Sequence, residues 1–342
     1  MQTLYLRAGM RQVIIMMNVN EFEKKQILFV FLNRGEKVSF ANDNIIVKDA
    51  EGKIKHQSTC YRLFMVFIVG SLSITSGIVQ RAHKFGFPIV LMTTSMRVYD
   101  YMGGKMEGNV LLRKHQYSYE KLDLAKHILI NKLQNQRWLL NLQRDKSENV
   151  KEAIQQIDQY LQGLIEYEGD LQGLLGFEGS AARVYFKNHF NNIPWNGRKP
   201  RIKPDFINST LDIGYTILFN VMDALLNVYG FDVYCGLLHR QFYMRKSLVC
   251  DFVEPFRPLI DRQVKKAINL GQCREEDFAL INHKYLLKWA NNAKYIQFLI
   301  QPFLDNKKAM FLYVQGFYRA FMKQKEAKDY PIYLMEWEHD YY

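Results

Sequence analysis

The first hundred residues carry short apolar runs of strand length, separated by turn-forming residues. Runs rich in β-branched and aromatic side chains occupy residues 12–17, 26–33, 44–49 and 62–69. The segments NRGEK, ANDN and AEGK lie between the later runs and supply the Gly, Asn and Asp that tight turns favour. This spacing predicts a sheet-rich N-terminal region.

Residues 63–92 hold an apolar run, an amphipathic stretch and a second apolar run. The segment 63–79 is the most apolar in the chain, but its length and its Ser and Gly residues argue against a membrane span. Ser73 or Thr75 is suited to begin a helix, and Gly86 is suited to end it. The run PIVLMTT follows. We therefore predict a strand, a helix and a strand, which together form one βαβ-like crossover.

The period of the apolar residues changes after about position 119. Residues 120–143 and 150–176 place apolar side chains at spacings of three and four, which is typical of amphipathic helices. Further helices are expected at residues 207–228, around position 251, and as a pair between positions 276 and 323.

These patterns predict an α+β protein in two parts. The length of 342 residues suits two domains better than one core. A small N-terminal β-rich domain is expected over residues 1–112, followed by a larger all-α C-terminal domain over residues 113–342. The chain is expected to pass from one to the other between Gly108 and Ser118.

The charge of the chain changes the expected class of partner. Lys and Arg number 46 against 34 Asp and Glu, which leaves a formal charge of +12. This excess favours a polyanionic partner, because basic side chains that neutralise phosphates release counterions. The four cysteines show neither CxxC pairing nor the spacing of a secreted disulfide framework, and no signal peptide is apparent. We expect a cytoplasmic protein with reduced thiols.

Two ionisable residues stand where the apolar pattern predicts burial. Glu178 precedes the small residues GSAA, so we expect it near the start of a helix that approaches a neighbour closely, where the helix dipole favours a carboxylate. His239 ends the apolar stretch that follows a turn at Gly230. Each has a simpler explanation. Glu178 could pair with Arg183 or face solvent, and His239 could be a hydrogen-bonded core residue.

An acidic pair lies in the segment SLVCDFVEPFRPLIDRQV, which otherwise has the pattern of a buried helix. Asp251 and Glu254 are three residues apart and therefore share one helical face. Pro255 is expected to kink this helix or to begin a new helical segment. The simpler explanation is an amphipathic helix whose acids pair with Arg257 or Arg262.

The four residues Glu178, His239, Asp251 and Glu254 indicate a metal site if tertiary packing joins them. Acids that pack together repel each other unless one is protonated or a cation lies between them. One imidazole with several carboxylates and no cysteine suits Mg²⁺ or Mn²⁺ better than structural zinc. Such an ion would support phosphodiester chemistry.

A basic loop is expected to bind the nucleic acid on which such an ion would act. The segment IPWNGRKPRIKPD is broken by Pro and Gly and lies between two of the expected helices. Its Arg198, Arg201 and Lys203 would hold a phosphate backbone without reading its sequence.

Three segments, in this order, give the chain a family resemblance. GFEGSAARVYF, GYTILFNVMDALLNVYGFDVYCGLLH and SLVCDFVEPFRPLIDRQV closely resemble the CRISPR-associated protein one family, the integrase and endonuclease of spacer acquisition. SITSGIVQRAHKFGFPIVLM and AKHILINKLQNQ resemble its strand-helix-strand segment and the helix after its β domain. Two turns depart from the family pattern, because Val233 and Phe206 stand where proline is common. The resemblance covers most of the chain.

The resemblance implies a function and a role for each site residue. It implies a metal-dependent enzyme that joins the 3′ ends of captured double-stranded DNA fragments to a CRISPR repeat by transesterification. Glu178, His239 and Glu254 would be the ligands of Mg²⁺ or Mn²⁺, Asp251 would support the site, and Arg257 would lie near the DNA. It further implies a homodimer, the small CRISPR-associated protein two as a partner, contacts through the N-terminal domain, and no membrane.

Two other functions fit the same residues. One is a stand-alone metal-dependent nuclease that cleaves branched or single-stranded DNA without joining ends. The other is a non-catalytic DNA-binding scaffold whose acids form structural ion pairs. A DNA fragment with a blocked 3′ end separates joining from cleavage, and DNA binding that ignores Mn²⁺ would indicate the scaffold.

Overall fold

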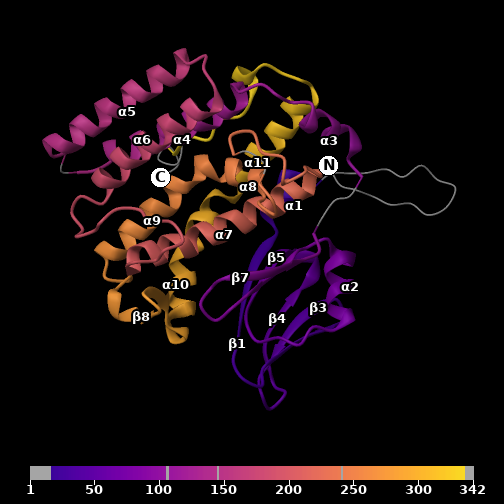
Figure 1. The fold of residues 1–342 in the computed structure, drawn as a ribbon. Coiled ribbons are helices and arrows are strands. Elements are labelled where there is room, and N and C mark those ends of the chain that lie inside the picture. The colour runs from indigo at the N-terminus through magenta and orange to yellow at the C-terminus, as the bar shows by residue number, and fades with distance from the viewer. Residues whose placement is uncertain (1–16, 105–107, 145, 240–241, 336–342) are drawn as a thin grey trace.

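The fold is seen in a computed structural model of the chain. The structure describes residues 17–335 except 105–107, 145 and 240–241. Most of the strand predicted at residues 12–17 lies outside the described residues. Within them, a sheet-rich region precedes a helical region, so the predicted α+β class is confirmed (Figure 1).

The larger sheet has four strands in the order β1-β5-β6-β7. The parallel strands are β1 (Gln26–Leu32), β5 (Leu63–Gly70) and β6 (Ile89–Met92). An edge strand, β7 (Val98–Met102), pairs antiparallel with β6. The predicted runs at 26–33 and 62–69 are therefore neighbouring strands.

The smaller sheet is an antiparallel meander of β2 (Lys37–Ala41), β3 (Asn44–Lys48) and β4 (Ile54–Thr59). The hydrophobic pattern predicted only β3, whose central residues are buried. The strand β4 is mostly exposed and has no apolar run, so nothing in its composition marks it as a strand.

The strand β5 explains why residues 63–79 are so apolar. Every residue of β5 is buried. Phe67 and Val69 pack in a core shared with the helices, whereas Val66 and Ile68 pack in a second core shared with the smaller sheet. Parallel strands covered on both faces read as continuous apolar runs rather than alternating ones.

The predicted crossover from β5 to β6 is confirmed. The helix α2 (Ser76–Phe85) begins after Thr75 and ends at Gly86, whose φ of 69° is left-handed. Glycine adopts this conformation without the steric cost that a Cβ atom would add. The two parallel strands and their connecting helix form the βαβ unit.

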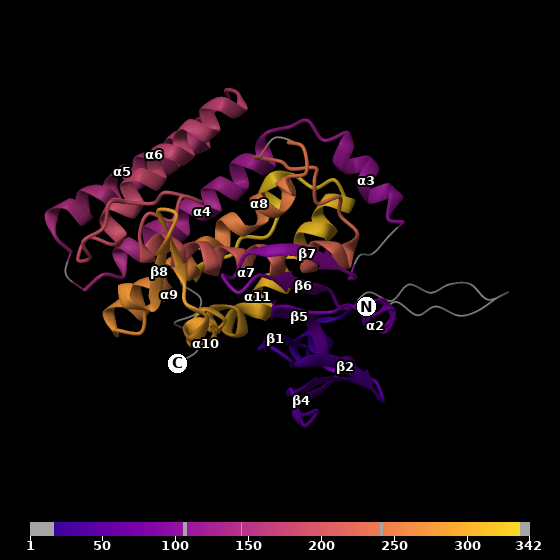
Figure 2. The same cartoon turned by 60° about the horizontal axis from the view of Figure 1, so that its bottom comes forward.

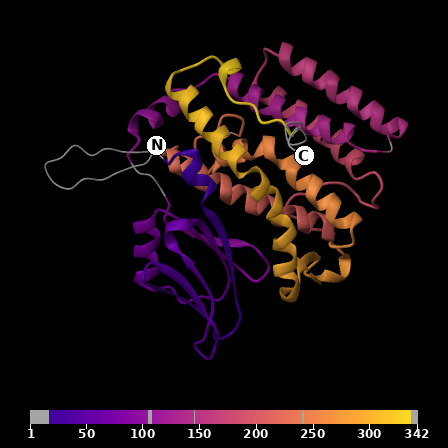
Figure 3. The same ribbon diagram turned by 180° about the vertical axis from the view of Figure 1, so that it is seen from behind.

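Helices make up most of the remaining chain. The short α1 (Val19–Glu23) precedes the sheets, and α11 lies against it. Seen from behind, α11 crosses the back of the helical region, and the turned view shows α5 and α6 side by side (Figures 2 and 3). The others are α3 (Val110–Tyr117), α4 (Asp123–Asn141), α5 (Glu148–Glu166), α6 (Leu171–His189), α7 (Phe206–Tyr229), α8 (Ser247–Val253), α9 (Arg257–Asn269), α10 (Asn292–Leu299) and α11 (Gln301–Met322).

The helix α7 is the centre of the helical region. Among the described residues it is the one helix long and apolar enough to cross a membrane, but 72% of the relevant window is buried inside the protein. It contacts α8, α9 and α11. We therefore interpret α7 as a core helix.

The predicted boundary at residues 112 and 113 falls inside α3. The helix-side core includes Phe67 and Val69 of β5, so apolar packing is continuous from the sheet into the helical region. The division into two domains stays a prediction.

One feature of the helical region differs from the all-α expectation. A hairpin of β8 (Phe278–Ile281) and β9 (Lys284–Leu287) lies where the sequence suggested helix. Its turn residues Asn282 and His283 have φ values of 48° and 60°. Two positive φ values are what a two-residue hairpin turn requires, and Asn tolerates them better than most residues.

Candidate active site

The first predicted acid, Glu178, lies in the middle of α6. The helix begins after Asp170, whose side chain accepts a hydrogen bond from the Gly173 backbone N–H. The prediction that Glu178 sits near the helix start is therefore wrong, because α6 begins two turns earlier than the small residues indicated. Gly179 is not a point of close approach either, since no atom lies within 4 Å of where its Cβ would be. It lines a cavity instead.

The second acid, Glu254, lies where one helix gives way to another. The helix α8 ends at Val253, a 3₁₀ turn covers Glu254–Phe256, and α9 follows. The break at Pro255 was predicted, because proline removes a backbone donor from a helix. The Glu254 side chain is only 3% exposed.

A lysine joins these two acids. Lys132 of α4 places its Nζ 2.6 Å from Glu178 Oε1 and 2.6 Å from Glu254 Oε2. Arg257 Nε lies 3.0 Å from the other Glu254 oxygen, so the simpler explanation that paired this acid with Arg257 is correct. The explanation that paired Glu178 with Arg183 is not, because the acid faces Lys132. Acids from α6 and from the α8–α9 break therefore meet at one buried cation.

The sequence analysis missed Lys132. Its position is four residues after Ile128 and three after Leu129, which are both buried in the core. A lysine on the apolar face of an amphipathic helix is costly unless a carboxylate pairs with it. The position of this lysine on the apolar face was therefore the sequence feature that could have identified it as a partner of buried acids.

The charges around Glu254 favour its ionised form. Burial alone would raise the pKa of Glu254, but Arg257, Lys132 and, more weakly, His239 outweigh it and lower the pKa to about 2. Burial likewise acts to lower the pKa of Lys132, but attraction from Glu254 and Glu178 leaves that pKa raised. Both partners are therefore charged at neutral pH.

His239 is held by the remaining acid. Its ring Nδ1 lies 2.6 Å from Asp251 Oδ1, and the same carboxylate accepts backbone N–H groups of Leu237, Leu238 and His239. Asp251 is completely buried, and this burial raises its pKa despite the hydrogen bonds. A carboxylate that accepts from Nδ1 leaves the lone pair on Nε2, which is the usual arrangement of a histidine that binds a metal. Asp251 therefore pairs with His239, and not with Arg257 or Arg262.

The residue types fit a divalent cation, although the side chains do not now surround one position. Within the part of the chain that the structure describes, no group of three or more His, Cys, Asp or Glu side chains is close enough to share a metal ion. Yet Glu254 Oε2 is buried, and among the described residues it has the ion pair with Lys132 but no hydrogen bond of good geometry. Two carboxylates and a carboxylate-held imidazole are a donor set that Mg²⁺ or Mn²⁺ accepts. A divalent cation would fit between these side chains only after the Lys132 ammonium moves away from the two carboxylates.

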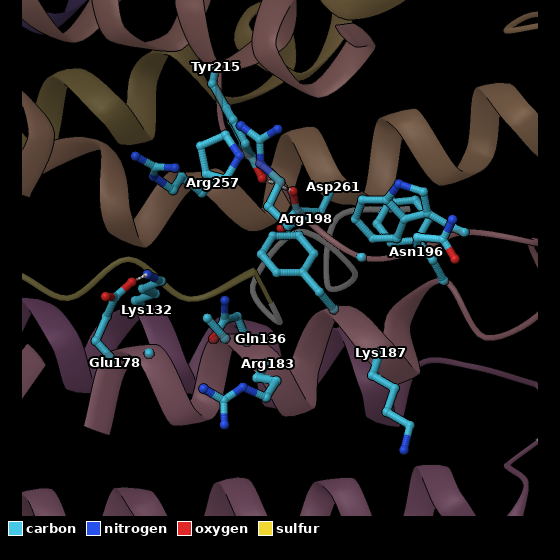
Figure 4. Close-up of a pocket in the computed structure, with 17 residues that line it drawn as sticks. Lys132, Gln136, Glu178, Arg183, Lys187, Asn196, Arg198, Tyr215, Arg257 and Asp261 are labelled. Atoms are coloured by element: carbon cyan, nitrogen blue, oxygen red, sulfur yellow. Dashed lines mark hydrogen bonds and ion pairs between the residues drawn. The ribbon is translucent and has the colours of Figure 1, made fainter. Parts of the chain in front are cut away.

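A cavity of about 590 Å³ opens beside Glu178 and beside Lys132 and Arg257, the two cations that contact Glu254. Figure 4 shows Lys132 and Glu178 facing each other at one end and Asn196 at the other. A positive and partly aromatic wall of this kind suits a phosphate chain that carries bases. The lining includes the cations Lys132, Arg183, Lys187, Arg198 and Arg257 and the rings of Phe186, Phe190, Trp195 and Tyr215.

The predicted DNA-binding residues differ in how accessible they are. Arg257 and Arg198 lie 4.9 Å and 5.1 Å from the ring centre of Tyr215. Arg198 also forms an ion pair with Asp212 at 2.5 Å, and its side chain is 11% exposed. Its charge is therefore largely neutralised within the protein.

Two further loop residues, Arg201 and Lys203, adopt positive φ values. Arg201 is exposed, whereas Lys203 is half-buried and its carbonyl accepts the Tyr285 N–H of β9. Burial lowers the pKa of Lys203. Of the three predicted loop cations, Arg201 is the one fully presented to solvent.

Comparison with known proteins identifies the family. The family model of CRISPR associated protein Cas1 matches residues 29–300. The chain belongs to the Cas1 family. The Cas1 match spans the sheets, the acids, the histidine and the basic loop, as the resemblance implied.

Two curated Cas1 relatives show how far the likeness extends. An endonuclease from Rhodospirillum rubrum, named CRISPR-associated endonuclease Cas1 2, is 30% identical over 252 residues, covering 68% of this chain and 73% of the relative. A Cas1 endonuclease from Thermodesulfovibrio yellowstonii is 25% identical over 313 residues, covering 87% and 98%.

Solved structures share the Cas1 fold at lower identity. A casposase bound to integration product has a TM-score of 0.74 at 18% identity, covering 92% of this chain and 99% of that one. A Cas1 protein from Thermotoga maritima has a TM-score of 0.72 at 17% identity, covering 86% and 97%. A chain of a Cas6-RT-Cas1–Cas2 complex has a TM-score of 0.78 at 22% identity, and the present chain spans 91% of itself but only 36% of that longer chain.

Proposed function

We propose that this Cas1-family chain is a metal-dependent DNA integrase and endonuclease of CRISPR adaptation. It joins the 3′-hydroxyl ends of captured DNA fragments to the CRISPR repeat by transesterification. One observation carries the proposal: Glu178 and Glu254, from separate helices, share one buried cation at the end of a basic cavity. The imidazole of His239 is fixed nearby by Asp251.

Glu178, Glu254 and His239 are the residues that would hold Mg²⁺ or Mn²⁺. When bound, such an ion lowers the pKa of an attacking hydroxyl and offsets charge on the leaving oxygen. Asp251 keeps the His239 ring oriented and its Nε2 lone pair available. Arg257 forms an ion pair with Glu254, with 3.0 Å between Arg257 Nε and Glu254 Oε1. This pair limits how far the carboxylate can turn.

The cavity positions the DNA strand for an in-line exchange. The 3′-oxygen of the captured fragment forms a bond to phosphorus in the repeat, and the bond from that phosphorus to the repeat's own 3′-oxygen breaks. One phosphodiester is made for each one lost, so no energy-rich cofactor is needed. The cations along the cavity offset the phosphate charge, and the aromatic rings offer surfaces on which bases stack.

Partners follow from the comparisons. The likeness in fold to a casposase bound to integration product and to a chain of a Cas1–Cas2 complex supports double-stranded DNA and the small CRISPR-associated protein two as partners. We propose a homodimer with contacts through residues 1–112. We also propose a cytoplasmic location, which the buried position of α7 supports.

A half-site integration assay tests this function. The protein would be given a supercoiled plasmid with a CRISPR repeat, a fragment with free or blocked 3′ ends, and the partner protein in half of the reactions. We expect joined product only with Mg²⁺ or Mn²⁺ and a free 3′ end. Cleavage that persists with blocked ends and without joining would favour the stand-alone nuclease. DNA binding without either reaction would favour the scaffold.

The basic loop should contribute to the salt dependence of DNA binding. Each phosphate contact that is lost reduces the slope of log affinity against log salt by about one. We expect R201A/K203A to flatten the slope, with R201A alone giving most of the change because Lys203 is half-buried. Fluorescence anisotropy between about 50 and 200 mM salt measures it. K55A, which removes an exposed charge from β4, is the matched control, and equal slopes in all variants would remove the loop from the DNA path.

A further inference from the structure

Lys132 occupies the place between the two carboxylates. Its side chain is 6% exposed and comes from α4, whereas the acids come from α6 and from the break after α8. A divalent ion of this class binds carboxylate oxygens at about 2.0–2.2 Å. Because Nζ lies 2.6 Å from one oxygen of each acid, the ammonium and an ion held by those two oxygens cannot occupy this place together.

The charge of the site is already balanced by the protein. Among the four side chains that contact one another directly, Glu178 and Glu254 contribute two negative charges, and Lys132 and Arg257 contribute two positive ones. A divalent ion added to these four side chains without any rearrangement would leave them with an excess of positive charge in a buried place, which is costly. Metal binding and the lysine contacts are therefore in competition.

The geometry points to Lys132 as an exchangeable cation, and we propose that its ammonium holds the two acids together until a divalent ion replaces it. This inference rests on the proposed metal site. It explains how the acids stay close without a metal, since two carboxylates alone would repel each other. The exchange lowers the apparent metal affinity and keeps the site assembled in the meantime.

The cavity beside Glu178 has room for the displaced ammonium of Lys132. Lys132 lines the cavity of about 590 Å³ that we assign to DNA. A rotation of its flexible stem would bring the ammonium from the carboxylates into the cavity, where a phosphate is its natural partner. Metal binding would in this way free the charge of Lys132, which already lines the cavity, for contact with a phosphate.

Metal titration without DNA tests the exchange. K132M keeps an unbranched, flexible side chain that is one atom shorter and removes its charge, and K126M is the matched control. Lys126 lies on the same helix, and its ammonium donates to the carbonyl groups of Ile165 and Tyr167. We expect K132M to bind Mn²⁺ at least about tenfold more tightly than the wild type and K126M by calorimetry, because no ammonium has to leave. We also expect K132M to show a lower melting temperature without metal and a larger rise with it.

The possible results separate the inference from the proposed function. Equal or weaker Mn²⁺ binding by K132M, with clear binding by the wild type, would overturn the exchange and leave the metal site standing. If the wild type binds Mn²⁺ no better than E178Q, the proposed metal site itself fails.

A second measurement needs no variant and covers the case in which K132M does not fold. The wild-type protein would be treated with an amine-acylating reagent, and the modification of Lys132 and Lys126 would be followed by peptide mass spectrometry. Exchange predicts that Mg²⁺ increases the acylation of Lys132 several-fold while that of Lys126 stays constant. No change at Lys132 at a saturating Mg²⁺ concentration would contradict the exchange.

Discussion

Replacing His239 with alanine should lower strand transfer by roughly 10²–10⁴-fold, because metal stabilisation is worth several kcal/mol and each 1.4 kcal/mol is a factor of ten in rate. His239 is held at Nδ1 by Asp251, which leaves the lone pair on Nε2 for the proposed ion. The loss should appear in joining and in the reverse reaction, in which a branched DNA is resolved, since both use the same groups. Product on a denaturing gel from a repeat-bearing plasmid measures it.

Controls separate a metal ligand from a structural histidine. D251N should lower the rate less, by about 10–100-fold, because it disturbs the orientation of the ring without removing it. H56A changes an exposed histidine of β4 and should behave like the wild type. DNA affinity without metal should be unchanged in H239A. Near wild-type joining by H239A would mean that the ring is only a packing residue.

The second large effect is a difference in the free energy of unfolding between variants of Glu254 and Glu178. E254Q should destabilise the protein by about 3–5 kcal/mol, because it leaves the charge of Arg257 in the interior beside a neutral partner and leaves Lys132 to pair with the more exposed Glu178. E178Q should cost much less, since its side chain is 29% exposed and Lys132 keeps Glu254. Both variants should nevertheless lose strand transfer. Urea unfolding with a chelator present gives the two free energies.

The difference between E254Q and the wild type should depend on pH. The pKa of Glu254 is about 2 in the folded protein and about 4.3 in an unfolded chain. A lowered pKa stabilises the fold above the unfolded value, and this stabilisation is lost as pH falls toward the folded value. The two proteins should therefore differ most above about pH 4.5 and converge as pH falls toward 2. An E254Q protein as stable as E178Q at neutral pH would show that the Glu254 ion pairs contribute little.

Much of the fold could be predicted because burial leaves a strong pattern. The fully buried β5 appears as an unbroken apolar run, and Gly86 marks the left-handed end of α2. The exposed β4 has no such pattern, and its pairing with β3 depends on residues outside it. The hairpin of β8 and β9 was missed because Phe278–Ile281 is too short to distinguish strand from helix by period.

The site was predicted less completely than the fold. The sequence indicated Glu178, His239, Asp251 and Glu254 singly, and the resemblance assigned their roles, but no local pattern could show which of them touch. The structure joins the two glutamates through Lys132 and joins His239 to Asp251. The contacts of Lys132 depend on the packing of α4 against α6 and against the turn at Pro255, which is a tertiary property.

Two asparagines on the same helix as Lys132 bind the chain near its described end. Asn131 and Asn135 exchange hydrogen bonds with the backbone of Tyr333 and Met335, and Asn135 also donates to the Pro255 carbonyl beside Glu254. Removal of residues 333–335 would therefore leave the side chains of both asparagines without these partners in the interior, on the helix that carries Lys132.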